Sequence, residues 1–300
     1  MESINNLTKT KIYEILDLAN SFKREQTRNN SLSKYIFGLF FFESSTRTLC
    51  SFESAIHRLG GKIIHYNRAN SSEKKGESLT DTIITLEKYV DVLIIRHPSN
   101  NFIPMIKKLT KKPIINAGDG SGEHPTQALL DLFTIIEHFP SLPKTISFIG
   151  DNRYSRTVHS LLYLLNIMDA EININSINDN ELEIPIDIFK KLNKDRIRNS
   201  NIIDINMINE SDVIYVTRMQ KERYKEDNQY KKPFIIDLEL VKNTHENAII
   251  LHPFPRNEEL STDIDPTCKN KYFDQMENGV YVRMSIIYLI IKELNLNIEL

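Results

Sequence analysis

A run of hydroxyl side chains with one guanidinium, residues 44–48 (Ser-Ser-Thr-Arg-Thr), lies between an apolar segment and an amphipathic one. The apolar segment, 35–42, has the continuous hydrophobicity of a strand buried on both faces of a parallel sheet. Apolar residues recur every three or four positions in 49–59, which predicts a helix. The hydroxyl run is therefore expected at a helix N-terminus, where backbone N–H groups and the helix dipole favour an anion such as phosphate. Taken alone, ordinary helix capping explains the same residues equally well.

Polar side chains also follow other predicted strands, and taken singly each could be a surface arginine or a structural histidine. They are Arg96, His124, Gln127, Arg156, Arg218, Gln220 and the segment 252–256. In doubly wound sheets ligands bind beyond the carboxyl ends of the strands, so these residues are candidates for one kind of site. They include no paired acids, nucleophile–base pair or metal cluster. Such a set would bind and orient anions without forming a covalent intermediate.

Two cofactor-binding patterns are absent from the sequence. Residues 44–48 lack the glycines and the Lys-Ser/Thr ending of a Walker loop, and 150–157 lack the glycine triad of a dinucleotide-binding turn. We expect neither a nicotinamide cofactor nor any other cofactor, and no metal.

Predicted strands and helices alternate along the chain. The strands are 35–42, 62–66, 90–96, 113–117, 145–150, 171–177, 212–217 and 248–251, and the helices are 49–59, 79–89, 103–109, 126–139, 157–168, 187–192 and 272–294. This alternation predicts an α/β protein with two doubly wound domains, each a parallel sheet flanked by helices. Pro140-Ser141-Leu142-Pro143 is the best candidate linker. We expect domains at 1–139 and 140–272, with a C-terminal helix at about 273–300 returning to the first.

Composition narrows the class of protein. The 300 residues allow about two domains, and a formal net charge of −2 does not indicate a nucleic-acid partner. Cys50 and Cys268 have neither metal-ligand spacing nor the pattern of a disulfide framework. The first residues lack the features of a signal peptide, and the apolar run 285–291 is too short to span a bilayer. We therefore expect a soluble, cytoplasmic protein without a membrane partner.

Several motifs together resemble a known family over nearly the whole chain. Residues 41–48 resemble the carbamoyl phosphate signature of the transcarbamoylases. The segments 124–127, 150–160, 217–223 and 252–256 resemble the catalytic chains of aspartate carbamoyltransferases, in the same order. Ornithine carbamoyltransferases usually have His-Cys-Leu-Pro where this chain has His-Pro-Phe-Pro at 252–255.

The resemblance implies roles for particular residues. The phosphate of carbamoyl phosphate would be held by Ser45, Thr46, Arg47, Thr48 and Arg96. Thr48, Arg96 and His124 would face the carbonyl oxygen, with Gln127 at the carbamoyl nitrogen. The carboxylates and amine of aspartate would meet Arg156, Arg218, Gln220, the Phe254 carbonyl and Pro255.

The resemblance also implies a homotrimer in which Ser71 and Lys75 complete a neighbour's site, with Lys75 touching both substrates; a separate regulatory chain is possible. Without the family, residues 71–77 would be interpreted as a solvated polar loop. Leu49 stands where the family usually has a second arginine, and Phe254 replaces the usual leucine. Residues 224–232 match a mobile loop of the family poorly.

The implied reaction is attack of the aspartate amine on carbamoyl phosphate, giving carbamoyl aspartate and phosphate without a cofactor, as in pyrimidine biosynthesis. Two alternatives remain at this stage. Ornithine as acceptor is disfavoured, because Arg156 and Arg218 would repel a cationic side chain. A non-enzymatic anion-binding protein of the same fold is the third possibility.

Overall fold

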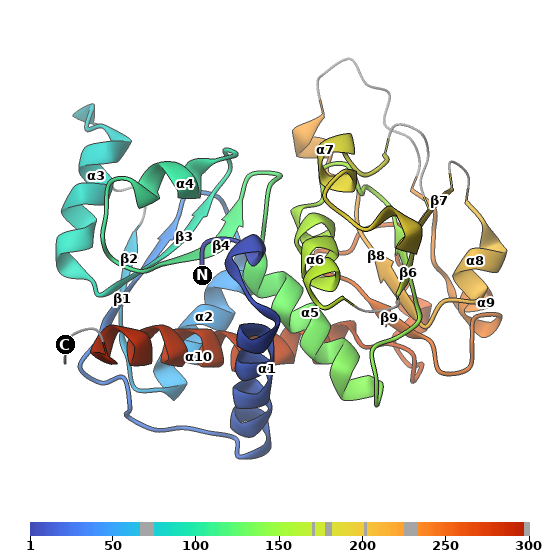
Figure 1. Cartoon of the computed structure of the whole chain (residues 1–300), viewed down its shortest axis with the longest axis horizontal. Helices are drawn as coiled ribbons and strands as arrows, with labels where there is room; N and C mark the ends of the chain where they lie inside the picture. The colour runs from blue at the N-terminus through green and yellow to red at the C-terminus, as the bar shows by residue number, and fades with distance from the viewer. Residues whose placement is uncertain (67–74, 170–171, 178–181, 201–202, 225–232, 297–300) are drawn as a thin grey trace. The chain divides into compact units, whose positions relative to one another are not determined.

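Figure 1 shows the chain as a computed structural model, which describes residues 1–66, 75–169, 172–177, 182–200, 203–224 and 233–296. The chain divides into two compact units. The first comprises Met1–Leu130 and Glu277–Leu300, and the second comprises Asp131–Met276. Each unit is described by itself below.

The first unit contains a parallel sheet with the strand order β2-β1-β3-β4 among the described residues. The strands are β1 (Ile36–Phe41), β2 (Lys62–Tyr66), β3 (Val92–His97) and β4 (Ile114–Asp119). The helices are α1 (Lys9–Arg24), α2 (Thr46–Arg58), α3 (Leu79–Leu86), α4 (Phe102–Lys107) and most of α10 (Tyr272–Leu296), with 3-10 turns at Ile4–Asn6 and Glu87–Tyr89. Phe37, Leu39 and Phe40 of β1 are fully buried, which explains why this strand is apolar throughout.

The second unit contains a parallel sheet with the order β7-β6-β5-β8-β9 among the described residues. The strands are β5 (Thr145–Ile149), β6 (Asn173–Ile177), β7 (Ile197–Ser200), β8 (Val213–Val216) and β9 (Ile249–Leu251). The helices are the larger part of α5 (Pro125–His138), α6 (Arg156–Ile167), α7 (Ile186–Phe189), α8 (Ile205–Asn209) and α9 (Leu238–Lys242), with 3-10 turns at Lys194–Arg196, Lys221–Arg223 and Thr262–Ile264. One core of this unit packs β8 residues Ile214 and Val216 against Ile250 of β9.

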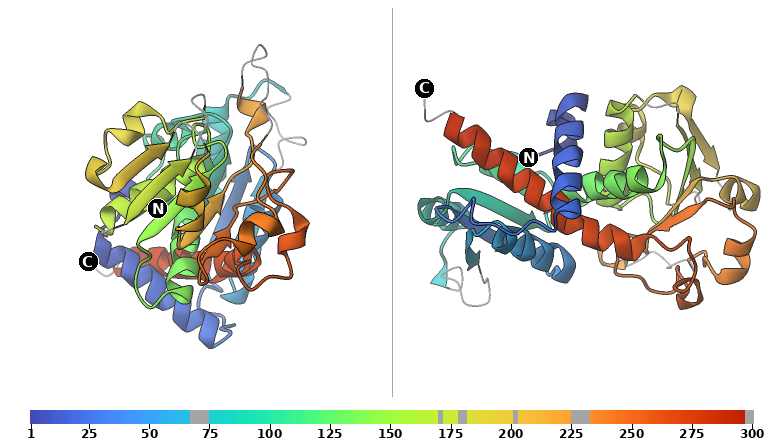
Figure 2. Two further views of the ribbon diagram at one scale, coloured as in Figure 1. Left: turned by 90° about the vertical axis from the view of Figure 1, so that its right-hand side faces the viewer. Right: turned by 90° about the horizontal axis from the view of Figure 1, so that it is seen from below.

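Helix α10 packs against α1 and crosses it within the first unit, as Figure 2 shows. Ser285 donates a hydrogen bond to the Ile15 carbonyl (2.7 Å), and Phe22 meets Tyr288 edge-on with ring centroids 5.9 Å apart. The predicted return of the C-terminal helix to the first unit is thus confirmed, as are the two parallel sheets flanked by helices.

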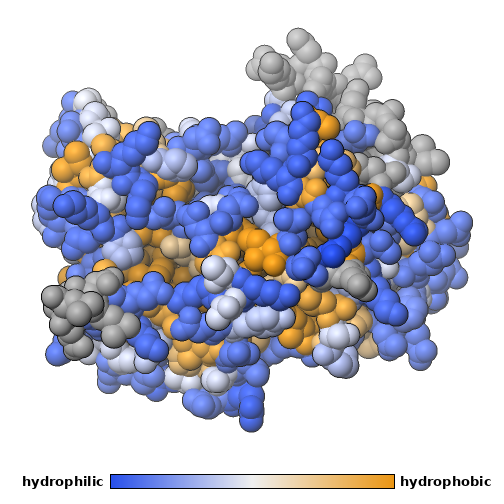
Figure 3. Space-filling view, in the orientation of Figure 1, coloured by the Kyte–Doolittle hydropathy of each residue, from blue (hydrophilic) through white to orange (hydrophobic). Residues whose placement is uncertain are grey.

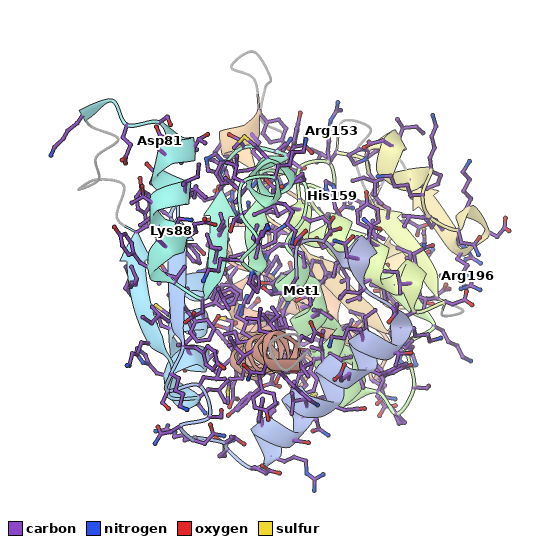
Figure 4. All side chains as sticks on the ribbon, turned by 60° about the vertical axis from the view of Figure 1, so that its left-hand side comes forward. Met1, Asp81, Lys88, Arg153, His159 and Arg196 are labelled. Carbon is purple, nitrogen blue, oxygen red and sulfur yellow. The ribbon has the colours of Figure 1, made fainter. Side chains whose placement is uncertain are left out.

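The N-terminal residues cover the free edge of β4. Met1, labelled in Figure 4, accepts a hydrogen bond from the Asn116 backbone N–H (2.9 Å). The Asn116 side-chain amide donates to the Glu2 carbonyl (3.0 Å). A covered edge strand cannot pair with another chain, so this segment protects the sheet.

The structure differs from the predicted elements in several places. Helix α1 was not predicted, although its buried residues Ile12, Leu16 and Ala19 have helical spacing and Thr8 caps it by accepting from the Lys11 N–H (3.2 Å). Strand β7 and helices α8 and α9 were also not predicted. The sequence of β7 is mostly polar, and the strand forms because the backbone edge of β6 is available for pairing. The predicted helix 187–192 is only the short α7 followed by turns, and the helix predicted at 79–89 ends as a 3-10 turn after Leu86.

The face of the protein drawn in Figure 3 is largely polar. In Figure 3, charged and polar side chains cover most of the face in view, with apolar side chains visible between them. None of the helices in the described part of the chain has the length and apolarity needed to cross a membrane.

Candidate active site

The hydroxyl run, residues 44–48, lies at the N-terminus of α2, as predicted. Ser45 is the N-cap residue, with extended backbone (φ −160°), but its side chain makes no capping hydrogen bond. Capping therefore does not account for Ser45. Thr46 and Arg47 are exposed, whereas Thr48 is buried. Leu49 is half-buried on the same helix.

Arg96 lies beside the hydroxyl run because β1 and β3 are adjacent and parallel. Phe41 pairs with Arg96 in the strand register, and the Phe42 N–H donates to the Arg96 carbonyl (2.8 Å). The Arg96 Nε lies 2.7 Å from a carboxylate oxygen of Glu43, and its Nη1 donates to the Ala117 carbonyl (3.5 Å). Glu43 thus holds the guanidinium at the end of the strand that leads into the run.

His124 reaches the same end of the sheet from the loop after β4. Its Nε2 lies 3.4 Å from the Thr48 Oγ1, and the ring is almost fully buried, with 3% of the residue exposed. The His124 carbonyl accepts from the Gln127 N–H (3.0 Å), and Pro125 is the first residue of α5, where a missing N–H costs nothing. Gln127, the third residue of α5, is also buried.

The first unit therefore gathers Thr48, His124, Arg96 and Glu43 at the carboxyl ends of its strands. Lys75 is exposed, and Ser71 lies outside the described residues. In the part of the chain that the structure describes, no three His, Cys, Asp or Glu side chains are grouped so that they could hold a metal ion.

In the second unit, Asp151 organises the loops after β5 and β8. This fully buried carboxylate accepts from the Gln220 N–H (3.0 Å), the Tyr224 hydroxyl (2.8 Å) and the Tyr154 N–H (3.0 Å). Burial, together with the charge of Asp151, raises the pKa of Tyr224. Sequence reasoning assigned Asp151 no role, although its place directly after a strand was a usable signal. Arg156, the first residue of α6, is 7% exposed in the same unit.

Position 150, directly before Asp151, must be a glycine because the ends of two strands approach each other closely there. Its φ is +109°, and a Cβ built there would lie 2.0 Å from the Thr217 carbonyl oxygen. The absence of a side chain lets the loops after β5 and β8 approach each other.

Arg218 already binds a carboxylate of its own chain. Its Nη1 donates to one Glu222 oxygen (2.9 Å), and its Nη2 donates to the other. The hydrogen bond to Glu222 raises the pKa of Arg218, and although burial opposes ionisation of Glu222, the bond from Arg218 holds the pKa of that carboxyl below its usual value. Sequence analysis missed Glu222 as the partner of Arg218, because neither residue lies in an α-helix whose spacing would have indicated the pair. This two-point geometry is the one that arginine uses for any carboxylate.

The segment after β9 is fixed by a buried histidine. The His252 Nδ1 accepts from the Phe254 N–H (2.8 Å), so its Nε2 carries the proton and faces Glu259 (3.0 Å). Burial raises the pKa of Glu259, but the hydrogen bonds from His252 and nearby backbone N–H groups prevail and lower it overall. Phe254 has a left-handed backbone (φ 56°), and its bond to Pro255 is cis.

The arrangement suits two different anions. The first unit offers hydroxyls, a helix N-terminus and guanidinium groups, which suit a phosphate. The second offers Arg156 and Arg218, which suit carboxylates.

Two family models match consecutive parts of the chain. Residues 1–137 match "Aspartate/ornithine carbamoyltransferase, carbamoyl-P binding domain", and residues 143–290 match "Aspartate/ornithine carbamoyltransferase, Asp/Orn binding domain".

Curated proteins and solved structures agree with these models. The aspartate carbamoyltransferase catalytic subunit of Thermoplasma volcanium is 40% identical over 96% of this chain and 97% of its own length. The multifunctional protein pyr1-3 of Dictyostelium discoideum is 39% identical over 96% of this chain, which spans only 13% of that protein. The crystal structure of aspartate transcarbamoylase from Trypanosoma cruzi with carbamoyl aspartate and phosphate superposes with a TM-score of 0.90 at 37% identity, covering 95% of this chain and 93% of the other. This chain belongs to the aspartate/ornithine carbamoyltransferase family.

Proposed function

We propose that this chain transfers the carbamoyl group of carbamoyl phosphate to the amine of L-aspartate, giving N-carbamoyl-L-aspartate and phosphate, an early step of pyrimidine (UMP) biosynthesis. The observation that carries the choice of acceptor is the geometry of Arg218. Its guanidinium binds the Glu222 carboxylate at two points, as it could bind a carboxylate of aspartate. Support comes from the Trypanosoma cruzi relative, whose structures contain carbamoyl phosphate, aspartate or carbamoyl aspartate.

In this proposal the first unit binds carbamoyl phosphate. The phosphate contacts are Ser45, Thr46, Arg47, Thr48, Ser71, Lys75 and Arg96. His124 acts with Thr48 and Arg96 on the carbonyl oxygen, and Gln127 accepts from the carbamoyl nitrogen. The 3.4 Å approach of the Thr48 hydroxyl to the His124 ring supports a shared target for these two groups.

The second unit orients aspartate. Arg156, Arg218 and Gln220 bind its carboxylates, and the Phe254 carbonyl and Pro255 lie near its amine. The neutral amine attacks the carbonyl carbon, a C–N bond forms, the C–O bond to phosphate breaks, and a proton passes from nitrogen to the leaving phosphate. The chain supplies positioning and stabilisation of the oxyanion and of the departing phosphate.

The proposal extends to assembly. Residues 1–139, completed by the helix at 273–300, form the carbamoyl phosphate domain, and residues 140–272 form the aspartate domain. Three copies form a homotrimer in which Ser71 and Lys75 enter a neighbour's site, and the enzyme acts in the cytoplasm. The exposed position of Lys75 is compatible with a contact to another copy.

A direct assay tests the choice of acceptor. Purified protein is given carbamoyl phosphate with aspartate or with ornithine, and the carbamoylated product is measured by mass spectrometry. We expect turnover with aspartate. Turnover with ornithine alone would contradict the proposed function.

Calorimetry tests the phosphate site. Arg47→Ala removes a charged contact from the first turn of α2 and should weaken carbamoyl phosphate binding by about 2–4 kcal/mol. Arg58→Ala is the matched control, because Arg58 ends the same helix and lies over the Tyr281 ring (5.4 Å). Unchanged binding in Arg47→Ala would remove Arg47 from the site.

A further inference from the structure

The loop that carries His124 is held by residues from the N-terminus, far away in the sequence. The Ser3 hydroxyl donates to the Glu123 Oε1 (2.5 Å), and the Ile4 N–H donates to the Glu123 Oε2 (2.8 Å). Both carboxylate oxygens of Glu123 are therefore bound by groups more than a hundred residues away, directly before His124.

The two partners of Glu123 are themselves held in place. Ser3 is the N-cap of the 3-10 turn Ile4–Asn6 and accepts from the Asn5 N–H (3.1 Å), which aligns its hydroxyl proton toward Glu123. Ile4 is fully buried. The preceding residues lie along the edge of β4, where Met1 accepts from the Asn116 N–H (2.9 Å). The clamp is thus built on the sheet itself.

The backbone of Glu123 is fixed as well. Its carbonyl accepts from the Asp119 N–H (3.0 Å), which closes the loop between the end of β4 and the start of α5. Within that loop, the Ser121 N–H donates to the Asn100 side-chain oxygen (2.6 Å). With main chain and side chain of Glu123 both fixed, the next residue has little freedom to move.

We propose that Ser3 and the Ile4 amide, by binding the Glu123 carboxylate, position the His124 ring against Thr48, which makes Glu123 and Ser3 positioning residues for the transfer reaction. The inference rests on the proposed function, in which His124 faces the carbonyl oxygen. Hydrogen bonds between a carboxylate and two donors are short and directional, so they fix the loop more tightly than apolar packing would. The 3.4 Å separation between His124 and Thr48 leaves room for a small shift to break their approach.

The test compares three variants with a matched control. Glu123→Gln keeps the shape but turns an N–H₂ group toward one of the donors, Ser3→Ala removes one donor, and Ser3→Thr restores a hydroxyl. The control is Asp91→Asn, because Asp91 also accepts from a distant backbone N–H, that of Ile36 (2.8 Å), but at the amino ends of β1 and β3. Asp91→Asn removes the negative charge from the same kind of bond, far from His124, and so weakens it.

We expect Glu123→Gln and Ser3→Ala to lower kcat by about 10- to 100-fold, the range for a catalytic group displaced by about 1 Å. The dissociation constant for carbamoyl phosphate should change far less than kcat, since the proposed phosphate contacts Ser45–Thr48 and Arg96 lie outside the His124 loop. Ser3→Thr should recover the wild-type kcat, and Asp91→Asn should keep it while lowering the melting temperature. A merely structural role would instead lower the melting temperature of all variants together without this division between kcat and binding.

Two results would overturn the inference. Glu123→Gln and Ser3→Ala with the wild-type kcat would show that His124 needs no clamp, and an equal loss of kcat in Asp91→Asn would show a general effect of destabilisation. Should Glu123→Gln fail to fold, the Ser3→Ala and Ser3→Thr pair decides alone. A wild-type chain that carbamoylates no aspartate would refute the proposed function and the positioning role with it, a result distinct from either of these.

Discussion

Arg218, which we propose binds aspartate, is paired with a carboxylate of its own chain. Its guanidinium is bound at two points by Glu222, so the fork is already oriented for a carboxylate. The carboxylate of an incoming aspartate would compete with Glu222 for the same nitrogens. Displacing Glu222 from the fork would therefore offset part of the free energy gained from the new bonds.

Arg218→Lys should raise the KM for aspartate by about 10- to 100-fold, corresponding to about 1.5–3 kcal/mol for hydrogen bonds to a charged group. A lysine ammonium cannot reproduce the two parallel bonds of the fork. Steady-state kinetics with varied aspartate provides the measurement, and carbamoyl phosphate affinity should not change. The control is Arg196→Lys, since Arg196, labelled in Figure 4, pairs with Asp169 (3.2 Å) at an exposed position of the same unit. Equal losses for both substrates would contradict the division of roles between the units.

Glu259 gives a prediction about acid stability. Its pKa is lowered in the folded chain, so its contribution to stability is present above the unfolded value of about 4.3 and is lost as the pH falls through the lower folded value. Glu259→Gln should therefore reduce the free energy of unfolding at neutral pH by about 1–3 kcal/mol and flatten its decline below about pH 4.3.

The free energy of unfolding of the second unit, measured by urea denaturation between pH 3 and 7, tests this effect. Glu258→Gln is the control, because Glu258 is the adjacent residue and is exposed. A parallel acid slope in wild type and Glu259→Gln would show that the pair with His252 has no such linkage.

At the scale of elements, parallel strands bring separate loops to one edge of each sheet. The adjacent strands β5 and β8 place Gly150 against Thr217, and Asp151 then binds the segment after β8. The two loops can approach this closely only without a side chain at Gly150. The sequence contains the glycine, but its neighbour across the sheet is not adjacent in sequence.

Gly150→Ala should destabilise the second unit by more than the roughly 1–3 kcal/mol of an unfavourable backbone conformation, because the new Cβ would also collide with the Thr217 carbonyl. Gly76→Ala separates the two effects. Gly76 also has a positive φ (+92°), but its Cβ would meet no described atom within 4 Å. Thermal unfolding of both variants is the measurement, and equal losses would mean that the collision is relieved at no cost.

At the scale of the whole molecule, the proposed homotrimer makes each site depend on two copies of the chain. Lys75→Ala and Arg47→Ala should each be nearly inactive alone, since losing one donor to a developing oxyanion typically costs about 10²–10³ in rate. Mixed and allowed to exchange subunits, they should regain activity, because both lesions can fall in one site and leave another intact.

Native mass spectrometry would quantify the hybrids, and activity should rise with their fraction. Mixing without dissociation and reassembly is the control and should restore nothing. Hybrids that form without regained activity would place Lys75 outside the shared site.

The sequence by itself determined the features that local patterns encode. Continuous apolar runs and helical periodicity predicted most strands and helices, because burial on a sheet or along a helix face repeats at fixed spacing. The motifs at strand ends, such as 44–48 and 252–256, identified the family and the candidate residues. A parallel sheet then requires those ends to meet at one edge, which is why Thr48 and His124 were expected in one site and are found in contact.

Only the tertiary structure decided which side chains hold these residues in place. Glu43 beside Arg96, Asp151 beneath Gln220, and Ser3 against Glu123 are single pairs between segments that no repeat connects. Strand order and register determine which of these residues meet. In the sequence, a polar loop residue that forms hydrogen bonds with water cannot be told from one that bonds to a buried donor. Strand β7 was missed for a related reason, because its pairing comes from the free backbone edge of β6 rather than from its own side chains.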